Sequence, residues 1–221
     1  MTVLSSLLYA KERFDHSIAI RFSCRMAACG SCGMKINGVP KLACYTQVTE
    51  FDEKPITVEP LDHYPIVRDL VTDFDDFFSK HGSIHPYMIR RDETEQETSA
   101  SEYVQSPREL EDFLQFSYCI KCGLCNAACP TFTNDRNFIG PQALGQAYRY
   151  VADSRDEGAL QRIRVIDSEH GIWRCHFAGS CTFVCPKGVD PALAIQKLRR
   201  LTIFPSFMKK KGAPLLVKHT A

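Results

Sequence analysis

The sequence has little net charge and no long apolar run. Its 27 Lys and Arg residues are balanced by 26 Asp and Glu, which leaves a formal charge of +1 over 221 residues. Without a basic excess, the chain has no general field with which to hold nucleic acid. Its apolar stretches, such as residues 4–10 with two serines inside, are far shorter than the roughly 18 to 20 residues that span a bilayer. No signal-peptide pattern opens the chain, so we expect a cytoplasmic protein that does not cross a membrane by itself.

The chain also lacks the short motifs that carry much of enzyme chemistry. No G-x-G-x-x-G follows an expected strand, and neither a P-loop nor a G-x-S-x-G is present. The seven histidines include no H-E-x-x-H pair. We therefore predict no catalytic residue on this chain.

Cysteine is what the sequence has in excess, with 11 residues, an odd number. A secreted disulfide scaffold is usually shorter and evenly paired, whereas clustered thiols in a reducing compartment favour metal binding. The cysteines fall into three groups, and none lies outside them: Cys24, Cys29, Cys32 and Cys44; Cys119, Cys122, Cys125 and Cys129; Cys175, Cys181 and Cys185.

The first group has the spacing C-x4-C-x2-C followed by a fourth cysteine, which is the ligand spacing of a plant-type [2Fe-2S] site. Gly30 and Gly33 follow two of the ligands, and glycine allows positive φ and a close approach of the backbone to inorganic sulfide. A zinc site is the alternative, but zinc ligands usually come as two C-x2-C pairs, which this group does not supply.

The second group forms C-x2-C-x2-C-x3-C-P, the bacterial ferredoxin pattern, in which the fourth cysteine binds the other cluster. The third group repeats it as C-x5-C-x3-C-P, with Ala178 in place of the second cysteine. Crossing the ligands assigns a [4Fe-4S] cluster to Cys119, Cys122, Cys125 and Cys185. It leaves Cys129, Cys175 and Cys181, and three thiolates favour a [3Fe-4S] cluster. A fourth ligand from water or a distant carboxylate stays open.

This assignment uses every cysteine, which a random or zinc-binding arrangement would not be expected to do. Three redox centres on a short chain have to lie in a row, because two of them share a domain through crossed ligation. The sequence therefore predicts a relay of single electrons between the two-electron cofactor of a partner and a second acceptor.

Apolar periodicity and turn residues predict a β-rich first part and a helical second part. A short helix is expected from Thr2 to Phe14. Strands are expected at residues 18–22, 34–36, 42–44 and 56–58, with a tight turn at Asn37-Gly38. Further helices are expected from about residue 73, from Ser106 toward Cys119, and at 140–153, 158–166 and 190–203.

Five stretches closely resemble the iron–sulfur subunit of the succinate dehydrogenase and fumarate reductase (complex II) family. They are SCRMAACGSCG at 23–33, VPKLAC at 39–44, the cysteine run at 119–130, FIGP at 138–141 and the run from Cys181 through CPKGVDP at 185–191. The resemblance implies an α+β fold class. A β-grasp, plant-type ferredoxin domain is expected at 1–72 and an all-α, bacterial-ferredoxin-like domain at 73–221.

The resemblance also implies partners. These are a flavoprotein subunit with covalent FAD that binds the dicarboxylate, and membrane-anchor subunits that bind quinone and hold the chain at the cytoplasmic face of the membrane. Electrons would pass between flavin, [2Fe-2S], [4Fe-4S], [3Fe-4S] and quinone in that order. Family members usually carry two strands before the first helix, so this domain is expected to lack its opening hairpin.

Three residues are candidates for the quinone end through the same resemblance. His176 follows a ligand of the third cluster, where an imidazole could donate to a quinone oxygen or pass a proton. Gln196 and Arg199 lie on the final expected helix. The wording of the loops is closer to the fumarate reductase branch, although the direction of the reaction depends on potentials that ligands alone do not set.

Two other functions compete with an enzyme subunit. One is a free-standing, ferredoxin-like electron carrier, against which three centres are more than a diffusing shuttle needs. The other is a structural zinc protein, against which the crossed C-P runs have no structural reason.

Overall fold

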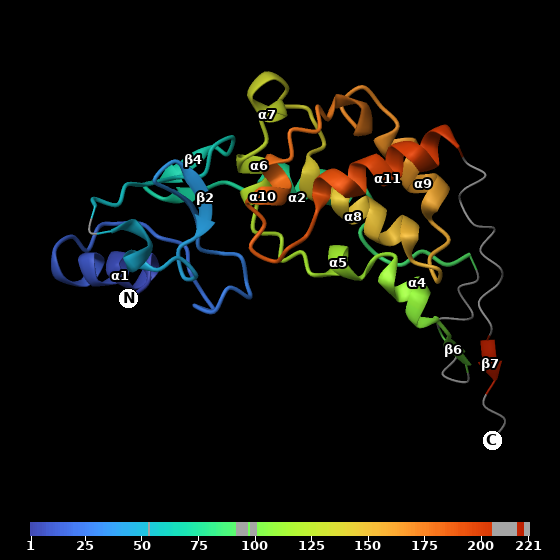
Figure 1. Ribbon diagram of the computed structural model, residues 1–221, viewed down its shortest axis with the longest axis horizontal. Helices are drawn as coiled ribbons and strands as arrows, with labels where there is room; N and C mark the ends of the chain where they lie inside the picture. The colour runs from blue at the N-terminus through green and yellow to red at the C-terminus, as the bar shows by residue number, and fades with distance from the viewer. Residues whose placement is uncertain (53, 92–96, 98–100, 205–215, 219–221) are drawn as a thin grey trace.

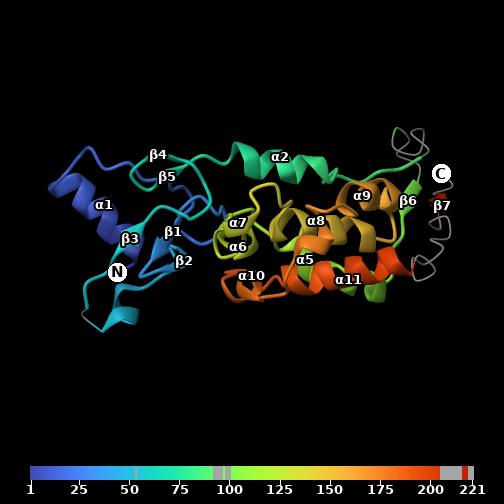
Figure 2. The ribbon, with the colours of Figure 1, turned by 90° about the horizontal axis from the view of Figure 1, so that it is seen from above.

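The structure is a computed structural model that describes residues 1–52, 54–91, 97, 101–204 and 216–218. The chain forms a smaller part with short strands and a larger helical part (Figure 1). Helix α2, Asp75–Ser83, runs along one side of the helical part (Figure 2). Within the described residues, none of the helices combines the length and the apolar character needed to cross a bilayer.

Helix α1, Val3–Arg13, opens the first part and confirms the helix predicted there. The Thr2 hydroxyl accepts from the Ser5 amide at 3.1 Å and caps the helix. The amides of Val3 and Leu4 donate to the carbonyls of Thr46 and Ala43, at 2.9 and 3.0 Å. The start of α1 is therefore held on the segment that carries Cys44.

A three-stranded sheet of order β2-β1-β3 lies beside this helix, built from β1 (Gly33–Ile36), β2 (Val39–Leu42) and β3 (Val58–Glu59). Asn37 and Gly38 have φ of 46° and 80°, the geometry of the tight hairpin turn predicted from the sequence. The returning strand was predicted at 42–44, but it begins at Val39, directly after the turn, and ends at Leu42. A 3-10 helix, η1 (Val48–Phe51), and a second hairpin, β4 (Ile66–Arg68) with β5 (Val71–Thr72), complete this part.

The strand predicted at residues 18–22 is wrong. The segment meets the β4–β5 turn only around Ala19, whose amide donates to Asp69 Oδ2 at 2.8 Å and whose carbonyl accepts from the Leu70 amide at 3.3 Å. Alternating apolar residues predict a strand only where a neighbouring strand continues the ladder, and here none does within the described residues.

The second part is helical, as predicted. Among the described residues its α-helices from residue 101 onward are α4 (Pro107–Glu111), α5 (Leu114–Ser117), α6 (Leu124–Ala127), α7 (Thr131–Asn134), α8 (Pro141–Ala152), α9 (Ala159–Ile166), α10 (Ser180–Phe183) and α11 (Pro191–Ile203). A 3-10 helix, η2 (Ile172–Arg174), and the pair β6 (Ser101–Tyr103) with β7 (Leu216–Lys218) complete it. The helix predicted from Ser106 toward Cys119 is broken in two at Asp112–Phe113.

Helices α8 and α11 pack on each other and carry the main helical core, which includes Leu144, Ala147, Ile195 and Leu198. The core of the first part does not stop at its own sheet, because Leu124 and Ala127 of α6 belong to it. Strand β5 ends at Thr72 and α2 begins at Asp75, next to the predicted division between residues 72 and 73. The ranges 1–72 and 73–221 remain a proposed division, with 205–215 and 219–221 outside the described residues.

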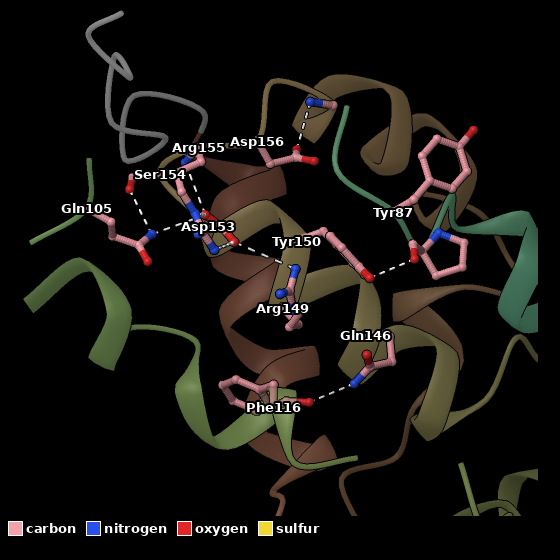
Figure 3. Close-up of polar contacts among 12 residues, drawn as sticks. Tyr87, Gln105, Phe116, Gln146, Arg149, Tyr150, Asp153, Ser154, Arg155 and Asp156 are labelled. Atoms are coloured by element: carbon pink, nitrogen blue, oxygen red, sulfur yellow. Dashed lines mark hydrogen bonds and ion pairs between the residues drawn. The ribbon is translucent and has the colours of Figure 1, made fainter. Parts of the chain in front are cut away.

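Polar side chains fasten the irregular segments of the second part to α8 and α9 (Figure 3). Gln105 Nε2 donates to Asp153 Oδ1 at 3.1 Å, and Tyr150 Oη donates to the Pro86 carbonyl at 2.6 Å. Arg162, fully buried, pairs with buried Asp156 at 2.7 Å. These bonds hold the connecting segments, which have no regular secondary structure, against α8 and α9.

Candidate iron–sulfur sites

The first cysteine group lies on the loop before β1 and just after β2. Six amides point at its sulfurs within 3.5 Å: those of Met26, Ala28 and Cys29 toward Cys24, that of Ala27 toward Cys44, that of Cys24 toward Cys29, and that of Cys44 toward Cys32. The loop can do this because Arg25, Ala27 and Gly30 have positive φ, which turns successive amides inward. The result is a cradle of N–H donors suited to anionic sulfur.

The four thiols of this group differ in exposure. Cys29 is exposed and Cys24 half-buried, whereas Cys32 and Cys44 are buried. Hydrogen bonds from Ser31, first from its side chain and then from its amide, lower the pKa of Cys29 to about 6. Burial raises the pKa of Cys32 to about 12. The site therefore has a solvent edge and a buried edge.

The two glycines of this loop do not share one role. Gly30 has the positive φ expected of it, 76°, whereas Gly33 belongs to β1 and needs no left-handed conformation. A Cβ on either would meet atoms of the second part: 2.9 Å from Cys122 Cβ at Gly30, and 3.1 Å from Leu124 Cδ2 at Gly33. Both positions are thus places of close packing between the two parts.

The second and third cysteine groups fold alike. Cys119 and Cys175 are each followed two residues later by left-handed backbone, at Lys121 (φ 55°) and Phe177 (φ 57°). Next come Gly123 (φ 79°) and Gly179 (φ 75°), each capping a four-residue helix, α6 and α10. The repeat places Ala178 where the other run has Cys122.

Each half of this repeat contributes cysteines to two hollows. A hollow of ≈ 440 Å³ is lined by Cys119, Cys122, Cys125 and Cys185. A hollow of ≈ 320 Å³ is lined by Cys129, Cys175 and Cys181, with Ala178 at its wall. The structure thus brings together the same two sets as the crossed assignment. Thiol-lined hollows of this size fit inorganic iron–sulfur clusters, and the missing thiol at Ala178 fits one with a missing corner.

Burial dominates the chemistry of these thiols. It raises the pKa of Cys122 to about 12 and that of Cys181 to about 11, with neighbouring thiols adding to both shifts. The pKa of Cys125 lies well above its ordinary value for the same reasons. Because a ligand thiol has to lose its proton, iron has to supply the stabilisation that solvent does not.

Across the described residues, no three His, Cys, Asp or Glu side chains form a group that could hold a single ion.

Comparisons with known proteins agree with this geometry. A family model described as a 2Fe-2S iron-sulfur cluster binding domain matches residues 1–79, and one described as a 4Fe-4S dicluster domain matches residues 115–189. The fumarate reductase iron-sulfur subunit of Mycobacterium tuberculosis is 47% identical over 208 residues, which cover 94% of this chain and 83% of the relative. The chain belongs to the family of succinate dehydrogenase and fumarate reductase iron–sulfur subunits.

Two further matches support this family. The succinate dehydrogenase iron-sulfur subunit of Paracoccus denitrificans is 37% identical over 202 residues, 91% of this chain and 76% of the relative. A chain of the Mycobacterium smegmatis Sdh1 complex in the apo form superposes with a TM-score of 0.83 at 25% identity, covering 93% of this chain and 86% of that one. The predicted recognition, fold class and function as an electron-transferring enzyme subunit are confirmed, and the free-standing carrier is set aside.

The three residues considered for the quinone end lie in different settings. His176 is exposed at the wall of the smaller hollow. Arg199 is engaged, because its guanidinium donates to the carbonyls of Ile172, Trp173 and Cys175 at 2.9, 3.4 and 2.6 Å. Gln196 Nε2 is buried and finds no partner within the described part of the chain. Arg199 therefore holds the backbone that carries Cys175.

Two contacts to sulfur were missed from the sequence. The Ser31 side chain bonds Cys29, and Gln142 Nε2 lies 3.9 Å from Cys119 Sγ. Ser31 stands between two ligands, which is a usable signal. Gln142 is distant in sequence, and only the packing of α8 brings it there.

Proposed function

We propose that this chain relays electrons between the FAD of a flavoprotein subunit and membrane quinone. Its ligand sets are Cys24, Cys29, Cys32 and Cys44 for [2Fe-2S]; Cys119, Cys122, Cys125 and Cys185 for [4Fe-4S]; and Cys129, Cys175 and Cys181 for [3Fe-4S]. The clusters supply one-electron redox chemistry, in which no bond is made or broken. The rest of the proposal concerns what the side chains and backbone of this chain do.

One observation carries the proposal: each hollow takes cysteines from both halves of the backbone repeat. Cys185 joins the cysteines of the first run, and Cys129 joins those of the second. A pair of independent metal sites would not need such an exchange. The short helices α6 and α10, which belong to the two runs, pack on each other.

The protein has two tasks at these sites. At the first loop, inward amides stabilise anionic sulfur and leave one edge open to solvent, toward which an electron partner can approach. At the two hollows, apolar packing excludes water from the thiolates.

The smaller hollow marks the quinone end in this proposal. The side chains of Phe177 and Phe183 are 57% and 86% exposed, and they come from the loop and the short helix around the hollow. Exposed aromatic rings of this kind suit apposition to membrane-anchor subunits at the cytoplasmic face. His176, on the same loop, would donate to or protonate a quinone oxygen, with Arg199 holding the loop and Gln196 on the neighbouring helix.

The decisive experiment is low-temperature EPR of the anaerobically purified complex, oxidised and then reduced with dithionite, with iron counted on the same sample. We expect a near-isotropic signal when oxidised, a [2Fe-2S] signal on reduction and about nine irons per chain. A silent oxidised sample with about ten irons would show that a non-cysteine ligand fills the corner at Ala178. A colourless preparation containing zinc would overturn the proposal.

A substitution at the vacant corner tests the third site separately. Ala178 matches Cys122 in the backbone repeat, so Ala178→Cys would place a thiol at the fourth corner of the smaller hollow. We expect the oxidised-state signal to be lost and the potential to fall as a fourth iron is bound. An unchanged oxidised-state signal would contradict the ligand assignment. Ala192→Cys, at the wall of the same hollow but outside the repeat, is the matched control.

A further inference from the structure

The first cysteine loop is packed onto the backbone of the second cysteine group. A Cβ at Gly30 would stand 2.9 Å from Cys122 Cβ, 2.9 Å from the Ile120 carbonyl and 3.0 Å from Cys122 Cα. A Cβ at Gly33 would stand 3.2 Å from the Cys122 carbonyl oxygen and 3.1 Å from Leu124 Cδ2. Any side chain at Gly30 would therefore push the two parts of the chain apart.

From this we propose that Gly30 and Gly33 are positioning residues that hold the first cysteine loop against Cys122. Cys122 is then the point at which electrons pass between the two parts of the chain. The inference rests on the proposed function, because it assumes clusters at the first loop and at the larger hollow.

The orientation of the first loop supports this route. Its exposed edge carries Cys24 and Cys29, whereas its buried edge carries Cys32 and Cys44. Gly30 directly follows Cys29 and Gly33 directly follows Cys32, so one ligand of each edge is next to a glycine that packs on the segment carrying Cys122. Electron transfer between centres weakens steeply with separation, and contact of the two backbones keeps the separation at its minimum.

The segment around Cys122 is also held from its other side. Tyr64 Oη donates to the Gly123 carbonyl at 3.0 Å, and Tyr64 stacks on Phe74 with ring centroids 4.4 Å apart. A Cβ at Gly123 would lie 2.6 Å from Phe74 and 2.7 Å from Tyr64 Oη. The segment around Cys122 is thus packed between these rings on one side and the first loop on the other. A side chain added at Gly30 or Gly33 therefore has to displace the first loop from it.

The chain offers matched control positions for both glycines. Gly38 has φ 80°, close to that of Gly30, but a Cβ there would meet nothing within 4 Å. Gly82 matches Gly33 in needing no positive φ, and a Cβ there would also meet nothing within 4 Å. Alanine at these four glycines therefore separates backbone strain from contact with Cys122.

The test is the relaxation of the [2Fe-2S] EPR signal in the anaerobically purified complex. Power saturation is measured after full reduction, and again at a potential where [4Fe-4S] stays oxidised and diamagnetic. In the wild type the reduced neighbour should speed relaxation. In Gly33→Ala, at full iron content, we expect part of this enhancement to be lost, seen as a lower half-saturation power. We expect a larger loss in Gly30→Ala and none in Gly38→Ala or Gly82→Ala.

Each other outcome decides against the inference or against the proposed function. Gly33→Ala with full iron and wild-type relaxation would overturn the inference, and so would an equal loss in Gly38→Ala. A wild-type signal that relaxes alike at both potentials would also overturn it. If the Gly30→Ala variant fails to bind iron, the relaxation of the [2Fe-2S] signal in Gly33→Ala still tests the inference. A wild type without the [2Fe-2S] signal would instead sink the proposed function.

Discussion

The two regions that carry cysteines differ most clearly at one thiol, the exposed Cys29 of the first loop. In the first loop, backbone amides lie within 3.5 Å of the sulfurs, and hydrogen bonds lower the pKa of Cys29 to about 6. Around the larger hollow of the helical part, burial dominates and raises the pKa of Cys122 to about 12. At Cys29 the first site is therefore suited to a charged thiolate before iron arrives, whereas Cys32 of the same site, with its pKa raised to about 12, and the thiols around the hollow depend on iron to make thiolates tolerable.

This difference implies a different dependence of folding on the clusters. The first part has its own sheet and helix, and of its ligands Cys24 and Cys29 lie on the partly exposed loop, whereas Cys32 and Cys44 belong to its core. In the helical part Cys129 belongs to the core and Cys119, Cys175 and Cys185 pack against it. The clusters proposed for the two hollows would therefore also complete the core of the helical part.

Removal of iron should give the largest effect. We expect chelation under reducing conditions to cost residues 115–189 their hydrogen-exchange protection, because the helical core would lose what fills the two cysteine-lined hollows. The sheet β1–β3 and α1 should stay protected longer. Hydrogen-exchange mass spectrometry of the holo and chelated chain measures this. Loss of protection first in residues 1–52 would reverse the comparison.

Each region offers one ion pair for comparison, a buried pair in the helical part and an exposed pair in the first part. Arg162 and Asp156 are both fully buried, and the guanidinium also donates to the carbonyls of His85 and Tyr87 at 3.0 and 2.6 Å. Arg162→Met would take the guanidinium away from the buried Asp156 carboxylate, which keeps the amides of Ile89 and Gly158, and should destabilise the chain by about 3–5 kcal/mol. Thermal unfolding of the holo chain checks this. The matched control is Lys41→Met, which breaks an exposed pair with Glu50 (3.0 Å) and should cost below about 1 kcal/mol.

An equal cost for the two substitutions would contradict this picture. It would mean that water reaches Asp156 as readily as Glu50. Figure 3 shows Asp156 in the same α8–α9 region as Asp153 and Arg155, where hydrogen bonds fasten the connecting segments.

The spacing of the cysteines predicted which of them lie together. The alternation of apolar residues was a poorer guide to where the strands lie. The cysteine runs fix loop lengths, and the hollows gather the same cysteines that the spacing groups, whereas the cluster that each set binds stays a prediction. The strand expected at 18–22 failed because a strand needs a partner, and the partner is a tertiary fact. The contact of Gly30 with Cys122 was equally out of reach, since it joins segments some 90 residues apart by packing alone.

A smaller effect is expected from the hydrogen bonds of the first loop. Ser31→Ala removes the side-chain bond that most lowers the pKa of Cys29. A bond worth about 1 kcal/mol would lower the [2Fe-2S] midpoint potential on the order of 40 mV, because the added electron loses a stabilising donor. A redox titration followed by EPR measures the shift. Ser31→Thr keeps the hydroxyl and should keep the potential. A potential that stays put in Ser31→Ala would show that the backbone amides suffice.

The smallest effect concerns His81, a histidine whose neutral form is favoured by burial, as the neutral form of the buried thiols is. His81, on α2, is buried and its Nδ1 accepts from Gln142 Nε2 at 3.2 Å, and burial, aided by Lys121, lowers its pKa to about 4. The unfolded chain, with a pKa of about 6.5 at this residue, binds the proton first as pH falls. Stability from this residue is therefore complete above pH 6.5 and lost toward pH 4, with about 0.8 kcal/mol lost between pH 7.5 and 6.

Urea unfolding of the holo chain at the two pH values measures this slope, and His81→Asn should remove it while keeping a side-chain acceptor. Because Gln142 also lies 3.9 Å from Cys119 Sγ, iron content has to be equal in both samples for the comparison to hold. If wild type and His81→Asn lose the same stability between these pH values, then His81 is already hydrated in the folded chain. Burial would then shift the pKa values of the thiols in the helical part but not that of the neighbouring His81. The difference in burial between the two regions would be limited to the residues that line the hollows.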